Sequence, residues 1–166
     1  MKRRLVITSI TSRAKLFFMK IAILSPLYPP DVAELASYTK ELVKRIRGKH
    51  TLTLLTYGHL PERIDDVTIV AVDKRSHILK RLFCYTIALR RLSGNVDLLY
   101  AQNGASVEFP LLLNSLLSRT PFVLRLGDSE AIKRTERSVM LRFIHHAVRR
   151  RAIEVIPHTG PLPKPE

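Results

Sequence analysis

Two amide side chains and a glycine, Gln102-Asn103-Gly104, directly follow the apolar stretch Leu98–Ala101. Amides both donate and accept hydrogen bonds, so at the end of a buried strand they could bind a sugar hydroxyl or a phosphate. The alternative is a tight turn that binds nothing. The pattern favours a binding role for Gln102 and makes Asn103 a second candidate.

Asp128 is another candidate, because it follows the apolar stretch Phe122–Leu126 and a glycine. A carboxylate at the end of a strand could take part in catalysis. The same residue could instead cap a helix that begins near Ser129. The sequence leaves both roles open.

The loop Ser25–Glu34 contains three prolines and follows the apolar run Ile21–Leu24. Asp31 and Glu34 have the spacing of a capping box, which predicts that Asp31 starts a helix. We expect this loop to face a ligand, with Pro30, Ala33 and Glu34 among the residues that line a cleft.

Several kinds of chemistry have no support in the sequence. His145 and His146 are adjacent, so on a helix they point about 100° apart and do not share a metal ion; a solvated basic helix face is expected. No glycine-rich phosphate loop follows the first strand, and no serine lies in a nucleophile elbow. Cys84 is predicted to be a buried, inert thiol in a helix. We expect no metal and no organic cofactor.

The net charge of +14 predicts attraction to anions. A predicted helix, Ser129–Arg150, runs into a cluster of arginines. This is either a solvated cationic face or a surface for anionic lipid, with Arg142, Arg149, Arg150 and Arg151 as candidates. Nucleic acid is not the expected partner, because no recognition motif accompanies the charge. A single cysteine and no run of membrane-spanning length favour a cytoplasmic protein, associated with the membrane only at its surface.

Apolar runs and helical stripes alternate along the chain. The runs predict strands, and the stripes predict four helices. The strands are Ile21–Leu24, Thr51–Tyr57, Val67–Val72, Leu98–Ala101, Phe122–Leu126 and Ala152–Ile156. The helices begin near Asp31, Ser76, Gly104 and Ser129. This order predicts one α/β domain over residues 19–160, a doubly wound parallel sheet in three layers. Residues 1–18 are expected to be a loosely ordered extension or an edge strand, and residues 161–166 an irregular tail.

Ligands of open α/β sheets bind beyond the carboxyl ends of the strands. We therefore expect four turns to meet at one edge of the sheet: Ser25–Glu34, Gln102–Gly104, Gly127–Glu130 and His158–Gly160.

Four segments resemble the N-terminal domain of family 4 glycosyltransferases of the GT-B fold. They are MKIAILSPLYPPDV from Met19, ASYTKELVKRI from Ala36, DLLYAQNGASVEFP from Asp97 and TPFVLRLGD from Thr120. The resemblance covers about residues 19–160 and implies a Rossmann-like domain that binds the sugar acceptor. It also implies a second domain that binds a nucleotide-sugar donor, and a metal-independent reaction that retains the anomeric configuration. Many members use lipid-linked acceptors.

The chain departs from the family pattern in the first loop and after the fourth strand. Ala33 and Glu34 stand where members carry a glycine pair, and Gln102 stands where many carry a histidine. The donor domain, with its pair of glutamates, is expected on another chain. We expect the acceptor-side half of a transferase, with the donor domain, an anionic membrane or a second copy as partners. The alternatives are a truncated, non-catalytic module that binds a sugar, lipid or protein, and an unrelated basic module that binds phosphate or nucleic acid.

Overall fold

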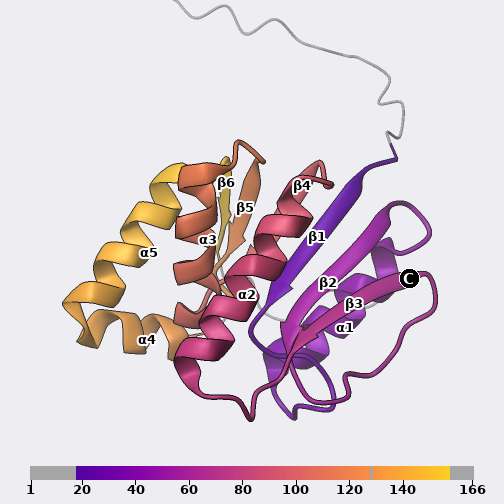
Figure 1. Ribbon diagram of the computed structural model, residues 1–166, viewed down its shortest axis with the longest axis horizontal. Coiled ribbons are helices and arrows are strands. Elements are labelled where there is room, and N and C mark those ends of the chain that lie inside the picture. Colours follow the sequence, from indigo (N-terminus) through magenta and orange to yellow (C-terminus); the bar gives the residue numbers. More distant parts are fainter. Residues whose placement is uncertain (1–17, 128, 158–166) are drawn as a thin grey trace, which may run out of the picture.

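Stretches rich in leucine, isoleucine and valine form the strands of one parallel sheet (Figure 1). The computed structural model describes residues 18–127 and 129–157. In this part of the chain the strands are β1 (Lys20–Ser25), β2 (Thr51–Tyr57), β3 (Val67–Val72), β4 (Leu98–Gln102), β5 (Phe122–Arg125) and β6 (Glu154–Ile156). All predicted strands are present, and β2 and β3 have the predicted bounds. The predicted extension and tail lie outside the described residues, apart from residue 18.

The strand order is β3-β2-β1-β4-β5-β6, and every neighbouring pair is parallel. The strand β1 thus lies in the middle of the sheet, with β2 and β3 on one side of it and β4, β5 and β6 on the other. This is the predicted doubly wound, Rossmann-like order. The continuous burial of Ile21–Leu24 agrees with a central strand that is covered on both faces.

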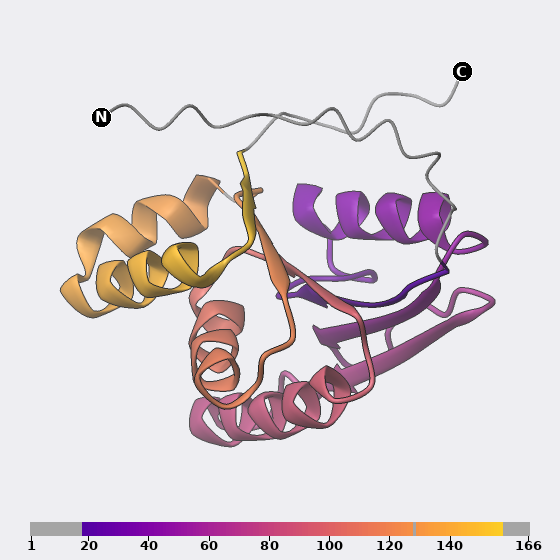
Figure 2. The same ribbon diagram turned by 90° about the horizontal axis from the view of Figure 1, so that it is seen from above.

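Helices cover both faces of the sheet: α1 (Glu34–Ile46) lies on one side, and α2 (Ile78–Ser93) and α3 (Ala105–Leu117) lie on the other (Figure 2). The helix α5 (Val139–Arg151) belongs with α2 and α3, because Ile144 and Val148 join their apolar core. A second core, on the α1 side, contains Val43 and Ile23. The predicted three-layer arrangement is therefore confirmed.

The predicted capping box at the start of α1 is wrong. The helix begins at Glu34, and its N-cap is Ala33, which makes no side-chain cap hydrogen bond. Asp31 is held in a turn, where its N–H donates to the Tyr28 carbonyl, and its carboxylate pairs with Lys74. Since the carboxylate is already paired, it does not cap the helix.

The predicted long helix from Ser129 is two helices, α4 (Ser129–Arg137) and α5. Ser138 has extended backbone angles, and its hydroxyl accepts the Leu141 N–H, so this residue ends one helix and caps the next. On α5, Ile144 and Val148 are buried, whereas Val139, Met140 and Phe143 are exposed.

Pro110 lies inside α3, in its second turn. A proline cannot donate to the carbonyl four residues earlier, here that of Ser106. The Tyr57 hydroxyl donates to this carbonyl at 2.8 Å and replaces the missing bond. A side chain from β2 thereby makes an interior proline tolerable.

Two further expectations from the sequence are corrected. Cys84 is exposed, because the buried face of α2 is formed by Tyr85 and Leu89. The helix α2, which was expected to begin near Ser76, begins at Ile78 and is capped by His77, whose ring accepts the Leu79 N–H. No helix in the described part of the chain has the length and hydropathy needed to cross a membrane.

Candidate functional site

Parallel pairing brings the carboxyl ends of the strands to one edge of the sheet. The loops after β1, β4 and β5 meet there. Gly104 lies against Pro26, and the Gly127 N–H donates to the Asn103 side chain at 2.9 Å. Three of the four predicted turns thus converge. The fourth turn, His158–Gly160, and the candidate Asp128 lie outside the described residues.

Gln102 is fully buried beneath this edge. Its Oε1 lies 2.9 Å from the Ser25 hydroxyl, and its Nε2 donates to the Thr39 hydroxyl at 3.0 Å. The Thr39 hydroxyl is also 2.7 Å from the Leu35 carbonyl. The amide therefore ties β4 to β1 and α1, and in this structure it does not reach solvent.

Asn103 is also buried, at 1% exposure. Its N–H donates to the Arg125 carbonyl at 2.9 Å, so the backbone and the side chain of Asn103 both bond to the strand or turn of β5. Gly104 has a φ of +144°, a conformation that residues with a side chain rarely adopt. These residues shape the edge of the sheet.

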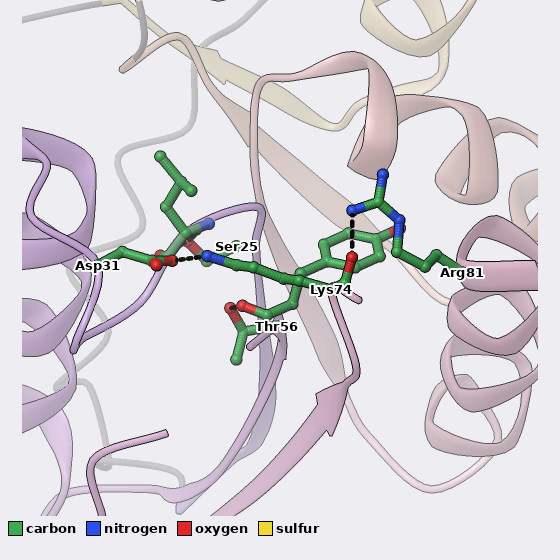
Figure 3. A network of polar contacts seen from close by, with 7 residues as sticks. Ser25, Asp31, Thr56, Lys74 and Arg81 are labelled. Atoms are coloured by element: carbon green, nitrogen blue, oxygen red, sulfur yellow. Dashed lines mark hydrogen bonds and ion pairs between the residues drawn. The ribbon is translucent and has the colours of Figure 1, made fainter. Parts of the chain in front are cut away.

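A small pocket of about 250 Å³ opens beside the loop after β1. Its wall includes Lys74 and Arg81, neither of which is among the residues predicted from the sequence. The basic pair Lys74-Arg75, just after β3, was a usable signal for Lys74 but not for Arg81, which lies in α2. Lys74 pairs with Asp31, and Arg81 Nη1 donates to the Lys74 carbonyl at 3.0 Å (Figure 3). Tyr57 forms part of the same wall. We call this the cationic pocket.

A larger groove of about 620 Å³ adjoins the cationic pocket between α2, α3 and α5. The two share the residues Pro26, Leu27, Ile78, Leu82 and Ser106. The rest of the groove is mostly apolar and includes Leu79, Phe109, Met140, Leu141 and Ile144, with Gly104 and Arg134 also in its wall. We call this the apolar groove. Pro30, Ala33 and Glu34 line neither space, since the loop contributes Pro26 and Leu27 instead.

His145 is not part of a solvated face, contrary to expectation. Its Nδ1 lies 2.9 Å from Glu108 Oε2, and the Gly104 N–H donates to Glu108 Oε1 at 3.1 Å. The carboxylate is 3% exposed. This pair, of which only the carboxylate is fully buried, links the first turn of α3 to α5 and places a histidine next to the loop after β4.

Four arginines of α5 are exposed: Arg142, Arg149, Arg150 and Arg151. Val139, Met140 and Phe143 are exposed on the same helix. Arg151 also donates to the Ser115 carbonyl at 3.3 Å, so it has a partner in α3. Among the residues that the structure describes, no cluster of three or more His, Cys, Asp or Glu side chains could hold a metal ion.

Three solved structures share this fold. Anabaena HepE, solved with UDP and glucose, matches with a TM-score of 0.55 at 21% identity, over 82% of this chain and 37% of that one. An α-glucosyltransferase bound to UDP and DNA matches with a TM-score of 0.53 at 12% identity, over 84% and 37%. The UDP-N-acetylglucosamine 2-epimerase assigned in Listeria monocytogenes matches with a TM-score of 0.54 at 8% identity, over 83% and 38%.

This protein spans little more than a third of the length of these solved chains. No protein-family profile and no curated protein sequence matches it. At these identities the likeness establishes the fold: a Rossmann-like α/β domain equivalent to one half of a GT-B architecture.

Proposed function

We propose that this chain is the acceptor-binding half of a retaining, nucleotide-sugar-dependent glycosyltransferase. A separate chain or domain binds the donor, and sugar transfer takes place between the two halves. The reaction needs no metal or organic cofactor. The observation that carries the proposal is the apolar groove joined to the cationic pocket, at the edge of the sheet where α/β folds bind ligands.

The likeness to solved proteins supports the same proposal, because two of the three were solved with UDP and the third is assigned as a UDP-N-acetylglucosamine 2-epimerase. Two of them are described with glucose or as a glucosyltransferase. The third is described as an epimerase, so the fold alone does not choose transfer over epimerisation. The resemblance of the four sequence segments to family 4 glycosyltransferases favours transfer.

The apolar groove and the cationic pocket would bind different parts of the acceptor. The apolar groove would hold an aliphatic or lipid-like part of the acceptor, because burial of apolar surface provides most of its affinity. Arg81 and Lys74 would hold an anionic or hydroxyl-bearing part at the other end. The buried Gln102 and Asn103 would support the loops that border the site.

The test is reconstitution of sugar transfer from two chains. The full chain is mixed with donor domains of related transferases, UDP-sugars and lipid-linked acceptors, and transfer is followed by mass spectrometry. Arg81→Gln should lower transfer at least about tenfold, since the loss of a charge-assisted hydrogen bond costs about 1.5–3 kcal/mol. Arg91→Gln, an exposed arginine of the same helix, is the matched control. Transfer that is unchanged in Arg81→Gln contradicts the acceptor site.

A non-catalytic binding module is the second candidate, and the size and apolar lining of the groove favour it independently of any reaction. In that case the chain binds the acceptor lipid with the same groove residues, and no donor domain supports transfer.

We also propose that the exposed apolar and arginine side chains of α5 bring the protein to the anionic cytoplasmic face of a membrane.

A further inference from the structure

The helix α3 lies between α2 and α5 (Figure 1 and Figure 2). Its exposed face is apolar: Phe109, Leu113 and Leu116 recur at helical spacing, with 37%, 37% and 58% of their surfaces exposed. Phe109 lies in the wall of the apolar groove, so Leu113 and Leu116 continue the groove toward the C-terminal end of α3. We call this continuation the outer channel.

The helix α2 forms one wall of the outer channel. Leu79 lines the apolar groove, and Phe83 and Arg90 follow it on about the same face of α2, because 3.6 residues make one turn. Arg90 Nη1 donates to the Leu117 carbonyl at 3.0 Å, so this face of α2 is turned toward the end of α3. Phe83 lies between these two points and is 67% exposed, which makes the wall apolar and open to solvent.

The helix α5 repeats this arrangement on the other side of α3. Met140 lines the apolar groove, and at the far end of the same face Arg151 Nη1 donates to the Ser115 carbonyl at 3.3 Å. Two exposed arginines, one from each flanking helix, are therefore held at the same end of α3. A guanidinium has five N–H donors, so each arginine can bind an outside carboxylate while it keeps its bond to α3.

We propose that the outer channel binds an amphipathic helix of a partner protein. The apolar side chains of that helix cover Phe83, Leu113 and Leu116, and its carboxylates bind the two arginines. Exposed apolar side chains that adjoin one another mark interaction sites on protein surfaces. The α2 wall from Phe83 to Arg90 extends about 10 Å, which matches about two turns of a helix. The inference does not rest on sugar transfer.

Charge and geometry favour such a helix over the alternative occupants. A second copy of this chain also carries a net charge of +14 and would bring arginines against arginines. A lipid bilayer takes up apolar side chains while the cationic side chains around them extend to its headgroups. Arg90 and Arg151 instead bond to the backbone of α3, at the end of the apolar stripe. This arrangement fits an elongated partner with acidic residues at one end.

The test uses the full chain and a synthetic, fluorescently labelled peptide of about 18 residues, long enough to form a helix. The peptide has leucines along one face and glutamates in its first turn, where they stabilise the helix. Fluorescence anisotropy gives its affinity. Leu116→Ser and Arg90→Gln, made separately, should each lower the affinity at least about tenfold, through loss of apolar burial and of a charge-assisted hydrogen bond.

The matched control variants are Val32→Ser and Arg91→Gln. Val32 is a fully exposed apolar residue of the loop after β1, and Arg91 is the exposed neighbour of Arg90 on α2. Both variants should bind the peptide as the natural protein does. A second peptide with lysines in place of the glutamates should bind the natural protein at least about tenfold more weakly.

Three results overturn the proposal: no binding of the glutamate peptide, equal affinity in the channel variants, or equal affinity for the lysine peptide. If Leu116→Ser does not keep the thermal unfolding midpoint of a folded protein, Arg90→Gln decides. Sedimentation tests the other occupants. If Leu116→Ser releases the protein from anionic vesicles or dissociates a dimer, while its affinity for the peptide is unchanged, the outer channel faces a membrane or a second copy and the proposal is wrong.

Discussion

At the scale of single residues, Gln102 shows how a strand-end amide can be a structural part of a site. It bonds to Ser25 and Thr39 and is fully buried. Gln102→Ala should lower the free energy of unfolding by about 1–3 kcal/mol, because it removes buried hydrogen bonds and leaves a cavity in place of the amide. Urea unfolding followed by circular dichroism measures this. Asn95→Ala, which removes an exposed amide bonded to a helix carbonyl, is the control and should cost much less.

Tyr28 provides a residue-scale prediction for alkaline pH. Burial, and then the charge of Glu62, raise the pKa of Tyr28 from 10.0 to about 12. The folded state therefore keeps a proton that the unfolded state loses above pH 10, and stability should be complete below pH 10 and fall between pH 10 and 12.

The measurement is the urea midpoint between pH 8 and 12. Tyr28→Phe should have a shallower decline than the natural protein over this window. An identical decline in the two proteins would mean that the Tyr28 phenol has the same pKa in the folded and the unfolded state.

At the scale of elements, α3 contains an interior proline that β2 makes tolerable. The Tyr57 hydroxyl donates to the Ser106 carbonyl, which Pro110 leaves free. Tyr57→Phe should therefore cost about 0.5–1.5 kcal/mol. In a Pro110→Ala background, the new N–H of residue 110 can bond to this carbonyl, and the cost should shrink. A double-mutant cycle of unfolding free energies measures the difference, and strict additivity would disprove the link.

The break between α4 and α5 is a second element-scale feature, and it depends on the hydroxyl of Ser138. Ser138→Ala should destabilise the protein by about 0.5–2 kcal/mol through loss of the N-cap, whereas Ser138→Asp should keep most of the stability. Thermal unfolding of both variants tests this. Equal stability of all three proteins would show that packing alone sets the start of α5.

At the scale of the whole molecule, the net charge of +14 and the exposed side chains of α5 predict binding to anionic vesicles. Replacement of Arg149 and Arg150 by serine should weaken binding about tenfold or more, at about 1 kcal/mol for each basic residue. Arg151 is left in place because it bonds to Ser115. Sedimentation with anionic and neutral vesicles measures this. Equal binding to both kinds would contradict a charged membrane face.

Much of the architecture followed from the sequence because local apolar patterns carry it. Most of each strand is a run of apolar or β-branched residues, and a run such as Ile21–Leu24 can be recognised without knowledge of its partner strands. The start of α1 could not be predicted from the sequence, since the partner of Asp31 is Lys74, far along the chain. The same holds for His145, whose partner Glu108 is on another helix.

The sequence by itself determined the alternation of strands and helices, and with it a parallel sheet with its loops at one edge, because periodicity and turn residues are local properties. Only the tertiary structure decided which polar residues are buried supports and which face a ligand. Gln102 was predicted at the edge, yet three elements enclose it, while Lys74 and Arg81 acquire their surroundings from segments distant in sequence. Burial and pairing depend on such contacts, and no local pattern records them.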